Sequence, residues 1–586
     1  MTLSRTHEQA GEETHAQPRP RVTTNRVVVW LLVALSAQFL LLGVVEAWKD
    51  SPTFDEGYYV SGGVTALTRH QLRLTPEHGV LAKVLGALPA LAAQPVVPAG
   101  TSWREGNQNG YYYDFLFAQQ HAHKLWSVFF LARLGSLAEG LALGWALYAL
   151  GSALFGRPAG VIAAAAWFTT PFSLAFSHIV GSDLPFALAV VLSGLALQRW
   201  AARQTVGRLV VLGLSCVALL LTRFTGLALV PVFAFGVVVL ADDARLRRRL
   251  TMGAAVLAMA WVGVWVVLRA VSPFPHYRHA PGFIGAVREA GFTRWARVIP
   301  WPKEYAAGIQ ETGRLANTST DTLLFGRHGV GARWLYWPGA MVVKLPASAM
   351  LLVAAALLCW FVAARSARAR MACAVVLPLI VLIVATVPYG RPSLRYLLAA
   401  IVLLFVLGAG ALARALQWKV GRVAVGVLAL VQLVMLWSAT PHSLAWTAPP
   451  FQPAYHFIGD TSDWGQDFYR LKHWAAGKNA MVEYFGPPLS VPGVRPFFGA
   501  DPRDVRGWVA VSASWLTYQA FTPSPAPSWL RAYCPVGTIG GSILVYRFRA
   551  PPDTQKGPVA PARACPGSYS HRVDRHRVAT GHDAPK

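Results

Sequence analysis

The chain reads VVVWLLVALSAQFLLLGVVEAWKDSPTFDEGYY over residues 27–59. The apolar part of this stretch, residues 27–47, has the length that crosses the hydrocarbon core of a bilayer. Trp48-Lys49-Asp50 follows it in place of a small-residue cleavage site, so we interpret the run as a retained signal anchor. The adjacent carboxylates Asp55 and Glu56 then stand at the membrane edge, where ionisable groups are costly unless the protein uses them.

The composition is that of a membrane protein. Of the 586 residues, 54% are hydrophobic and 14% are charged, and the mean hydropathy is +0.40. Soluble domains carry about 25% charged residues. The net charge of +26 would suit a nucleic-acid-binding protein. However, the basic residues fall in short loops between apolar runs, as the positive-inside rule expects of cytoplasmic loops. Nucleic acid is therefore excluded as the partner.

The apolar runs predict the membrane topology. Hydropathy indicates about eleven spans. They cover residues 27–47, 126–154, 159–178, 183–201, 207–221, 225–241, 251–271, 339–364, 371–389, 394–416 and 420–440. Arginine and lysine recur in every second loop, which places the N-terminus inside and the C-terminus outside. We therefore expect a mainly α-helical, multi-pass protein of the cytoplasmic (inner) membrane.

Three parts of the chain are expected on the outer side. They are a large first loop over residues 48–125, a second loop over 272–338, and everything after about residue 440. Within the first loop, VLAKVLGAL at residues 80–88 predicts an amphipathic helix that lies in the membrane interface. Loops of this length usually carry function when they are ordered.

The outer tail has the pattern of a small α/β domain. Asp463-Trp464-Gly465-Gln466-Asp467 predicts the start of a helix through about Ala476. Apolar stretches at 481–485, 508–513 and 542–548 suit strands. Cys534 and Cys565 lie where a disulfide is permitted. We divide the chain into a disordered cytoplasmic N-terminus (1–26), a transmembrane catalytic domain (27–440), an extracytoplasmic α/β domain (441–550) and a disordered tail (551–586).

Charged residues from distant parts of the sequence converge on the outer side of this topology. Besides Asp55 and Glu56 they are Asp183, Arg223, Lys344, Arg391 and Arg395. Such a set suits an anionic lipid head group beside a hydroxyl that must lose a proton. A base takes that proton during attack on a sugar's anomeric carbon, and arginine stabilises the departing phosphate with its bidentate fork. A further pair inside the second span, Arg133 and Glu139, is interpreted as structural.

The same residues resemble a known family. Asp55-Glu56, Pro76-Glu77-His78 and Ser182-Asp183-Leu184-Pro185 are similar to motifs of GT-C membrane glycosyltransferases, in particular the protein O-mannosyltransferase-like, phospholipid-carrier-dependent group related to glycosyltransferase family 39. Later segments match in the same order: Thr222-Arg223-Phe224, Arg395-Tyr396-Leu397-Leu398, Asp463-Trp464-Gly465-Gln466-Asp467 and Pro535-Val536-Gly537-Thr538-Ile539-Gly540-Gly541-Ser542-Ile543. One departure is His78-Gly79-Val80-Leu81, where the family usually has His-Pro-Pro-Leu.

The resemblance implies inverting transfer of a hexose, commonly mannose, from a polyprenyl-phosphate donor to a hydroxyl of a protein, lipid or glycan acceptor. It implies that the first-loop aspartate is the base or orients the acceptor. Our candidate catalytic residues are therefore Asp55 and Glu56. The candidate substrate-binding residues are Asp183, Arg223, Lys344, Arg391, Arg395, Tyr396, His78 and Lys83. No cofactor is predicted with certainty, and a divalent metal is an open alternative.

Other interpretations of the same sequence remain open. Asp55 and Asp183 could simply cap helices, because aspartate is a favoured N-cap. The protein could be a transporter or flippase of lipid-linked sugars, although paired repeats and midplane charges would then be expected. It could also be a non-catalytic assembly factor with a GT-C-like fold.

Overall fold

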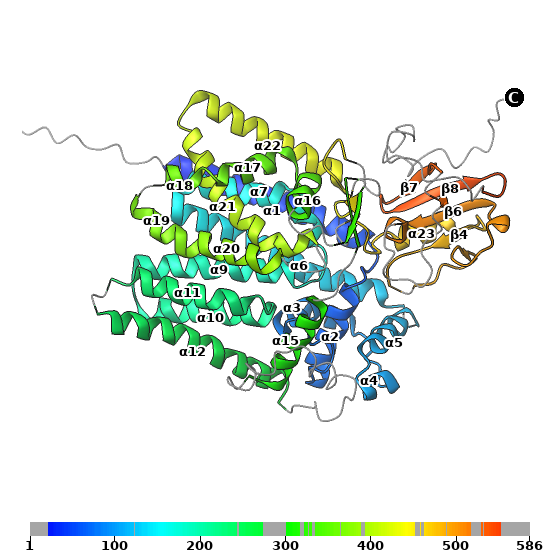
Figure 1. Ribbon diagram of the computed structural model, residues 1–586, viewed down its shortest axis with the longest axis horizontal. Helices are drawn as coiled ribbons and strands as arrows, with labels where there is room; N and C mark the ends of the chain where they lie inside the picture. The colour runs from blue at the N-terminus through cyan, green and yellow to red at the C-terminus, as the bar shows by residue number, and fades with distance from the viewer. Residues whose placement is uncertain are drawn as a thin grey trace, which may run out of the picture.

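Long helices form the main body of the protein, and a sheet domain stands at one end of it (Figure 1). The helices within residues 56–121 lie at the same end. This computed structural model describes residues 22–121, 123–242, 245–273, 301–316, 321–325, 327–330, 335–363, 365–387, 393–451, 457–458, 462–487, 489–516, 529–530 and 533–552.

Seven helices within these residues are long and apolar enough to cross a membrane. They are α1 (Val22–Lys49), α6 (Leu125–Phe155), α9 (Asp183–Ala202), α12 (Leu246–Val271), the run Ala367–Thr386 with α19 (Arg365–Met371) and α20 (Leu377–Thr386), the run Leu394–Ala415 with α21 (Leu398–Ala415), and α22 (Lys419–Ala439). The helices α7 (Arg157–Thr169) and α8 (Pro171–Ser177) make a further pair that is bent by 66°. The expected polytopic helical fold is confirmed.

Three predicted spans form shorter helices. Residues 207–221 and 225–241 coincide with α10 (Val206–Thr222) and α11 (Gly226–Leu240). The predicted span 339–364 is divided into α16 (Tyr336–Lys344), α17 (Ala347–Ala356) and α18 (Cys359–Val362). Its first break falls before Pro346, because proline disfavours the helical conformation of the residue that precedes it. With the seven long helices and the bent pair, these three account for the eleven predicted spans within the described residues.

The centre of the helical body is formed by α6, α7, α9 and α21. Most residues of α9 and α21 are buried. Small residues permit this close packing, as is usual between membrane helices. A Cβ at Gly408 of α21, for instance, would lie 2.0 Å from the Leu352 carbonyl oxygen of α17. Because the centre of the helical body is tightly packed, we look for functional groups at the ends of the helices.

The loop over residues 48–125, which was predicted to lie outside, is mainly helical where it is described. It contains α2 (Glu56–Arg69), α3 (Val80–Ala90), α4 (Thr101–Glu105) and α5 (Gln108–His121). A separate apolar core, which includes Tyr111, Tyr112 and Phe115, holds these helices against α6. The structure therefore contains the predicted helix at 80–88 and places it beside α2 and α6.

The second long loop, residues 272–338, contributes α15 (Lys303–Ala316) and the strands β1 (Asp321–Leu324) and β2 (Arg327–Val330) where it is described. They form a small antiparallel sheet with β3 (Phe457–Ile458), in the order β2-β1-β3. Since β3 comes after α22, this sheet connects the second long loop to the C-terminal part of the chain.

The C-terminal part contains a five-stranded sheet and one helix. Its order is β5-β4-β6-β8-β7, with β4 (Met481–Glu483), β5 (Arg495–Pro496), β6 (Gly507–Ser512), β7 (Gly537–Ile539) and β8 (Ile543–Phe548). β4 pairs in parallel with β5 and β6, whereas β8 is antiparallel to β6 and β7. The helix α23 (Phe468–Ala475) begins directly after Asp467. The predicted small α/β region is confirmed. Cys534 is disulfide-bonded, and Cys565 lies outside the described residues.

Candidate active site

Asp55 contacts an arginine that is distant in sequence. It stands at the N-cap position of α2, but its side chain makes no capping hydrogen bond. Instead, Arg395 donates a hydrogen bond from Nη2 to Asp55 Oδ2 at 3.0 Å. The capping interpretation of Asp55 is therefore wrong. The Asp55 side chain is 22% exposed, so a substrate can approach it.

A second carboxylate and a second guanidinium complete the cluster. Asp183 is the first residue of α9, whose N-cap is Ser182. Its Oδ1 pairs with Arg223, the C-cap residue of α10, and its Oδ2 lies 3.8 Å from Arg395 Nη1. The order Asp55–Arg395–Asp183–Arg223 thus alternates acid and base, and it brings together four residues singled out in the sequence. Asp183 makes an ion pair and is not the N-cap residue of α9.

Aromatic rings enclose the two guanidiniums. The Tyr396 ring centroid lies 5.0 Å from the guanidinium carbon of Arg395 and also 5.0 Å from that of Arg223. The Trp464 ring lies 4.3 Å from the Arg395 guanidinium carbon. Cation–π contacts of this kind strengthen when they are shielded from water. The sequence pattern identified Tyr396, but it assigned no role to Trp464, which comes from the C-terminal region.

Glu56 lies beside Asp55 in sequence but points into the protein. It is fully buried and pairs with Arg133 of α6, which donates from Nε to Oε1 at 2.9 Å and from Nη2 to Oε2 at 2.6 Å. The backbone N–H groups of Thr53 and Val180 also donate to its two oxygens. Glu56 therefore links the loop before α2 to the loop before α9.

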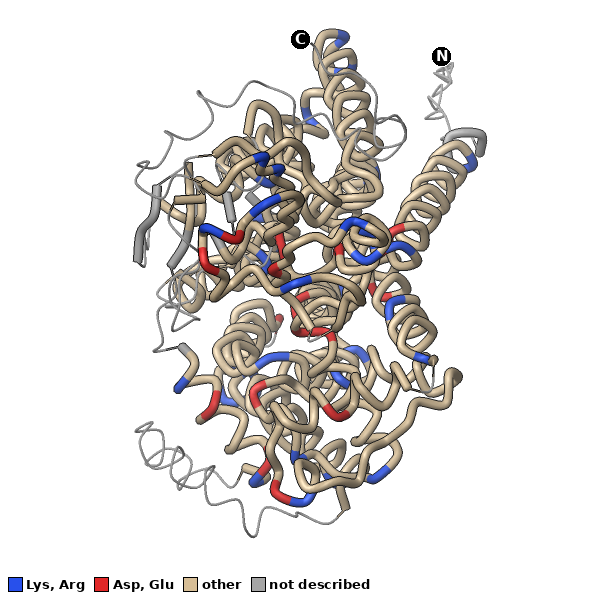
Figure 2. The backbone as a smooth tube through the Cα atoms, turned by 90° about the vertical axis from the view of Figure 1, so that its right-hand side faces the viewer, with Lys and Arg blue, Asp and Glu red and all other residues tan. Residues whose placement is uncertain are grey.

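Close to this pair, Asp50, which follows α1, contacts both a buried imidazole and an arginine of the C-terminal region. His178 Nε2 lies 3.0 Å from Asp50 Oδ2, and His178 Nδ1 lies 3.3 Å from Glu46 Oε2. Arg470 reaches Asp50 Oδ1 at 2.8 Å. Despite burial, which opposes ionisation, Arg470 and His178 lower the Asp50 pKa to about 2. Figure 2 shows acidic and basic positions side by side near the middle of this end of the molecule.

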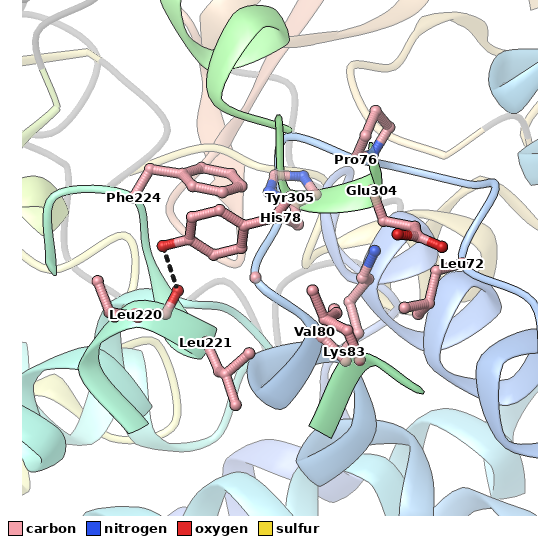
Figure 3. A pocket seen from close by; sticks show the side chains of 12 residues that line it. Leu72, Pro76, His78, Val80, Lys83, Leu220, Leu221, Phe224, Glu304 and Tyr305 are labelled. Atoms are coloured by element: carbon pink, nitrogen blue, oxygen red, sulfur yellow. Dashed lines mark hydrogen bonds between the residues drawn. The ribbon is translucent and has the colours of Figure 1, made fainter. Parts of the chain in front are cut away.

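His78 and Lys83 line a small pocket next to the charged cluster (Figure 3). The His78 ring stacks on Tyr59 with centroids 4.2 Å apart, and the Tyr59 hydroxyl donates to Ser182 Oγ at 2.9 Å. Burial lowers the pKa of Lys83 to about 8, while Glu77 opposes that shift. The Lys83 ammonium donates to the Leu74 and Thr75 carbonyls, at 3.0 Å and 2.9 Å.

The other wall of this pocket comes from the turn after α10 and from α15. Phe224 and Tyr305 pack edge to face with centroids 5.0 Å apart, and the Tyr305 hydroxyl donates to the Leu220 carbonyl at 3.1 Å. Glu304 extends into the pocket from α15 and pairs with Arg269 at 2.5 Å. The pocket therefore adjoins Arg223 through its neighbour Phe224.

Of the two remaining predicted binding residues, Lys344 does not join this cluster. Lys344 at the end of α16 is buried, and its ammonium donates to the carbonyls of Leu444 at 2.8 Å and Trp446 at 2.5 Å. It thus anchors the segment that follows α22. Arg391 lies outside the described residues.

Comparison with known families supports the resemblance found in the motifs. Residues 116–268 match the family model described as "Dolichyl-phosphate-mannose-protein mannosyltransferase". The matched segment includes Asp183 and Arg223. The similarity to GT-C glycosyltransferases related to family 39 is thereby confirmed for this segment. No curated protein matches the chain.

Several solved structures are similar to this chain. AglB, the oligosaccharyltransferase of Archaeoglobus fulgidus, in complex with an inhibitory peptide and a dolichol-phosphate, has 13% sequence identity, and the match covers 83% of this chain with a TM-score of 0.45. This chain spans 62% of that protein's length. ArnT from Cupriavidus metallidurans, bound to undecaprenyl phosphate, has 14% identity, and its match covers 88% of this chain and 97% of ArnT with a TM-score of 0.30.

Proposed function

We propose that this protein is a glycosyltransferase that transfers a hexose from a polyprenyl-phosphate donor to an acceptor hydroxyl. The observation that carries the proposal is the meeting of Asp55 with Arg395, Asp183 and Arg223 at one end of a membrane helix bundle. The family match at residues 116–268 favours a lipid-linked donor and mannose as the hexose, because its description names a dolichyl-phosphate-linked mannose.

Asp55 acts as the general base in this proposal. The acceptor oxygen attacks the anomeric carbon while the bond from that carbon to the carrier phosphate breaks, so the configuration inverts. The acceptor proton passes to the Asp55 carboxylate, and the carrier leaves as polyprenyl phosphate. A positioned base of this kind contributes about 10²–10⁴-fold to the rate.

Arg395 and Arg223 hold the carrier phosphate and stabilise the charge that it gains as it leaves. A guanidinium carries five N–H donors, so each arginine can keep its carboxylate partner and still donate to a phosphate. Asp183 orients both, since it pairs with Arg223 and also faces Arg395. Tyr396 forms a common aromatic wall for the two cations.

We assign the remaining candidates as follows. Glu56 positions the site rather than moving protons, because its two oxygens already accept from Arg133, Thr53 and Val180. His78 and Lys83 form the wall beside the phosphate site. Lys344 holds the backbone after α22 and does not touch substrate.

In our proposal the site lies at the outer face of the cytoplasmic membrane, with the N-terminus inside and the C-terminal region outside. The alternation of basic and non-basic loops along the sequence supports this orientation. The acceptor is a protein, lipid or glycan hydroxyl reached from that face. A transporter would instead concentrate its charges near the midplane, whereas the charged cluster here lies where α2, α9 and α10 begin or end.

The proposal is tested with purified protein and radiolabelled polyprenyl-phosphate-mannose. We expect label in an acceptor fraction from the same cells, with an anomeric configuration opposite to that of the donor. The configuration is determined by digestion with anomer-specific mannosidases. Release of free polyprenyl phosphate should equal the sugar transferred. Vectorial movement of intact donor across vesicles, with no bond cleavage, would instead identify a flippase.

A further inference from the structure

We infer that the turn at residues 462–467 of the C-terminal region belongs to the active site, and that Trp464 is the positioning residue that sets Arg395 and Asp55. This inference rests on the proposed function and assigns to the C-terminal region a part in it. It concerns positioning, since Trp464 reaches the reacting groups through Arg395 and through the backbone before Asp55.

The first observation is the contact between the indole and the guanidinium. Trp464 is 3% exposed, and its ring lies 4.3 Å from the guanidinium carbon of Arg395. The same guanidinium lies 3.0 Å from Asp55 Oδ2. The ring thus limits where Arg395 can point, in a place shielded from water where a cation–π contact is strong.

The second observation is independent of the ring and concerns the backbone. The Phe54 N–H donates to the Trp464 carbonyl at 2.9 Å, and the Ser51 N–H donates to the Gln466 carbonyl at 2.9 Å. Ser51 Oγ also donates to the Gly465 carbonyl at 2.7 Å and accepts from the Phe468 N–H at 2.8 Å. The turn therefore clamps the loop that immediately precedes Asp55.

The residue types of the turn suit this geometry. The Gln466 side chain accepts from the Trp464 N–H at 2.8 Å and donates to the Ser462 carbonyl at 3.0 Å, which closes the turn. Gly465 has φ +94°, and a Cβ there would lie 2.6 Å from the Tyr484 hydroxyl. Glycine meets both requirements, because it adopts positive φ at no steric cost.

Ionic contacts fasten the turn at its far end. Arg470 bridges Asp50 at 2.8 Å and Asp467 at 2.6 Å, and Asp467 also accepts from Ser542 Oγ at 2.6 Å. A Cβ at Gly540 would lie 1.7 Å from Asp467 Oδ1, so glycine is needed there too. The two C-terminal motifs, residues 463–467 and 535–543, therefore contact each other, and the first of them holds the loop that leads to Asp55.

These contacts link Trp464, Arg395 and the segment Phe54–Asp55 to one another. The links run from the Trp464 ring to Arg395, from Arg395 to Asp55, and from Phe54, next to Asp55, back to the Trp464 carbonyl. Removal of the Trp464 indole would leave the Arg395 guanidinium less restrained, and Arg395 would then bind the donor phosphate more weakly. The inference therefore predicts a change in donor binding and little change in acceptor binding.

The test compares donor and acceptor kinetics of the full-length Trp464→Leu variant with those of Trp474→Leu. Trp474 is a matched control: it lies on α23 with Lys478 5.5 Å from its ring, and it packs against Trp508 away from the site. We expect Trp464→Leu to raise the donor KM about 10- to 30-fold, the loss of a desolvated cation–π contact. The acceptor KM should stay within about twofold. Trp464→Phe, which keeps an aromatic face, should recover most of the loss.

Binding of undecaprenyl phosphate to the same variants provides a readout without turnover. Its Kd should rise in Trp464→Leu and not in Trp474→Leu. If Trp464→Leu does not fold, Ser51→Ala tests the same clamp from the opposite side and should also lower donor kcat/KM. The inference is overturned if Trp464→Leu matches wild type, or if Trp474→Leu loses as much. A wild-type protein that transfers no sugar would instead refute the proposed function.

Discussion

Replacement of Arg133 by methionine should destabilise the protein strongly, because it would leave Glu56 as an unpaired buried charge. The Arg133 guanidinium is 1% exposed and donates five hydrogen bonds: two to Glu56 and three to the carbonyls of Ala47, Asp50 and Ser51. Removing one partner of such a buried pair costs about 3–5 kcal/mol. The double variant Arg133→Met/Glu56→Gln has no unpaired charge at this place. Its free energy of unfolding should therefore exceed the value expected from the sum of the two single substitutions by about 1–3 kcal/mol, which is the coupling energy of the pair.

The assay is thermal unfolding of the purified variants in detergent, read together with donor binding. Arg314→Met is the matched control, because the Arg314–Glu311 pair is exposed, with the Arg314 side chain 50% accessible. Exposed pairs contribute about 0–1 kcal/mol, so this control should unfold like wild type. If Arg133→Met also unfolds like wild type, or if Glu56→Gln alone abolishes transfer in a fully stable protein, the structural assignment of Glu56 is refuted.

Three further results are expected. Arg395→Ala and Arg223→Ala should each weaken donor use by about 10- to 150-fold, since a charge-assisted contact is worth about 1.5–3 kcal/mol; a change in sugar preference with normal turnover of the native donor would rule out the phosphate role. A reporter fused after Thr440 should be extracytoplasmic and one at Arg247 cytoplasmic; the opposite locations would remove the outer active site. Lys344→Met should lower thermal stability and leave donor KM unchanged, because its ammonium contacts only backbone carbonyls in the described structure; a raised donor KM in a stable variant would restore it to the binding site.

Local patterns were sufficient for much of the fold. Hydropathy runs predicted the membrane helices, and the strands at 481–485, 508–513 and 542–548 form β4, β6 and β8. The convergence of Asp55, Asp183, Arg223 and Arg395 followed from topology alone, since alternating loops bring alternate helix ends to one side.

Long-range partners were not accessible to the same reasoning. The sequence contains no local sign that Trp464 stacks on Arg395 or that Glu56 meets Arg133, because each contact joins segments far apart in the chain. Lys344 was predicted to bind substrate because it lies near the start of a predicted span. Its ammonium instead donates to the carbonyls of Leu444 and Trp446, about 100 residues further along the chain. For charges at membrane depth, tertiary pairing decides between a structural and a chemical role.

The central claim is that Asp55 is the base, and the single-turnover rate of Asp55→Asn tests it most directly. Asparagine keeps the shape and an oxygen that can accept from Arg395, so position and donor binding should survive. We predict normal folding, donor affinity within about threefold of wild type, and transfer slowed by about 10²–10⁴-fold, the usual contribution of a positioned base. Transfer at a near-normal rate by Asp55→Asn would contradict the account, because no proton acceptor would then be needed at this position.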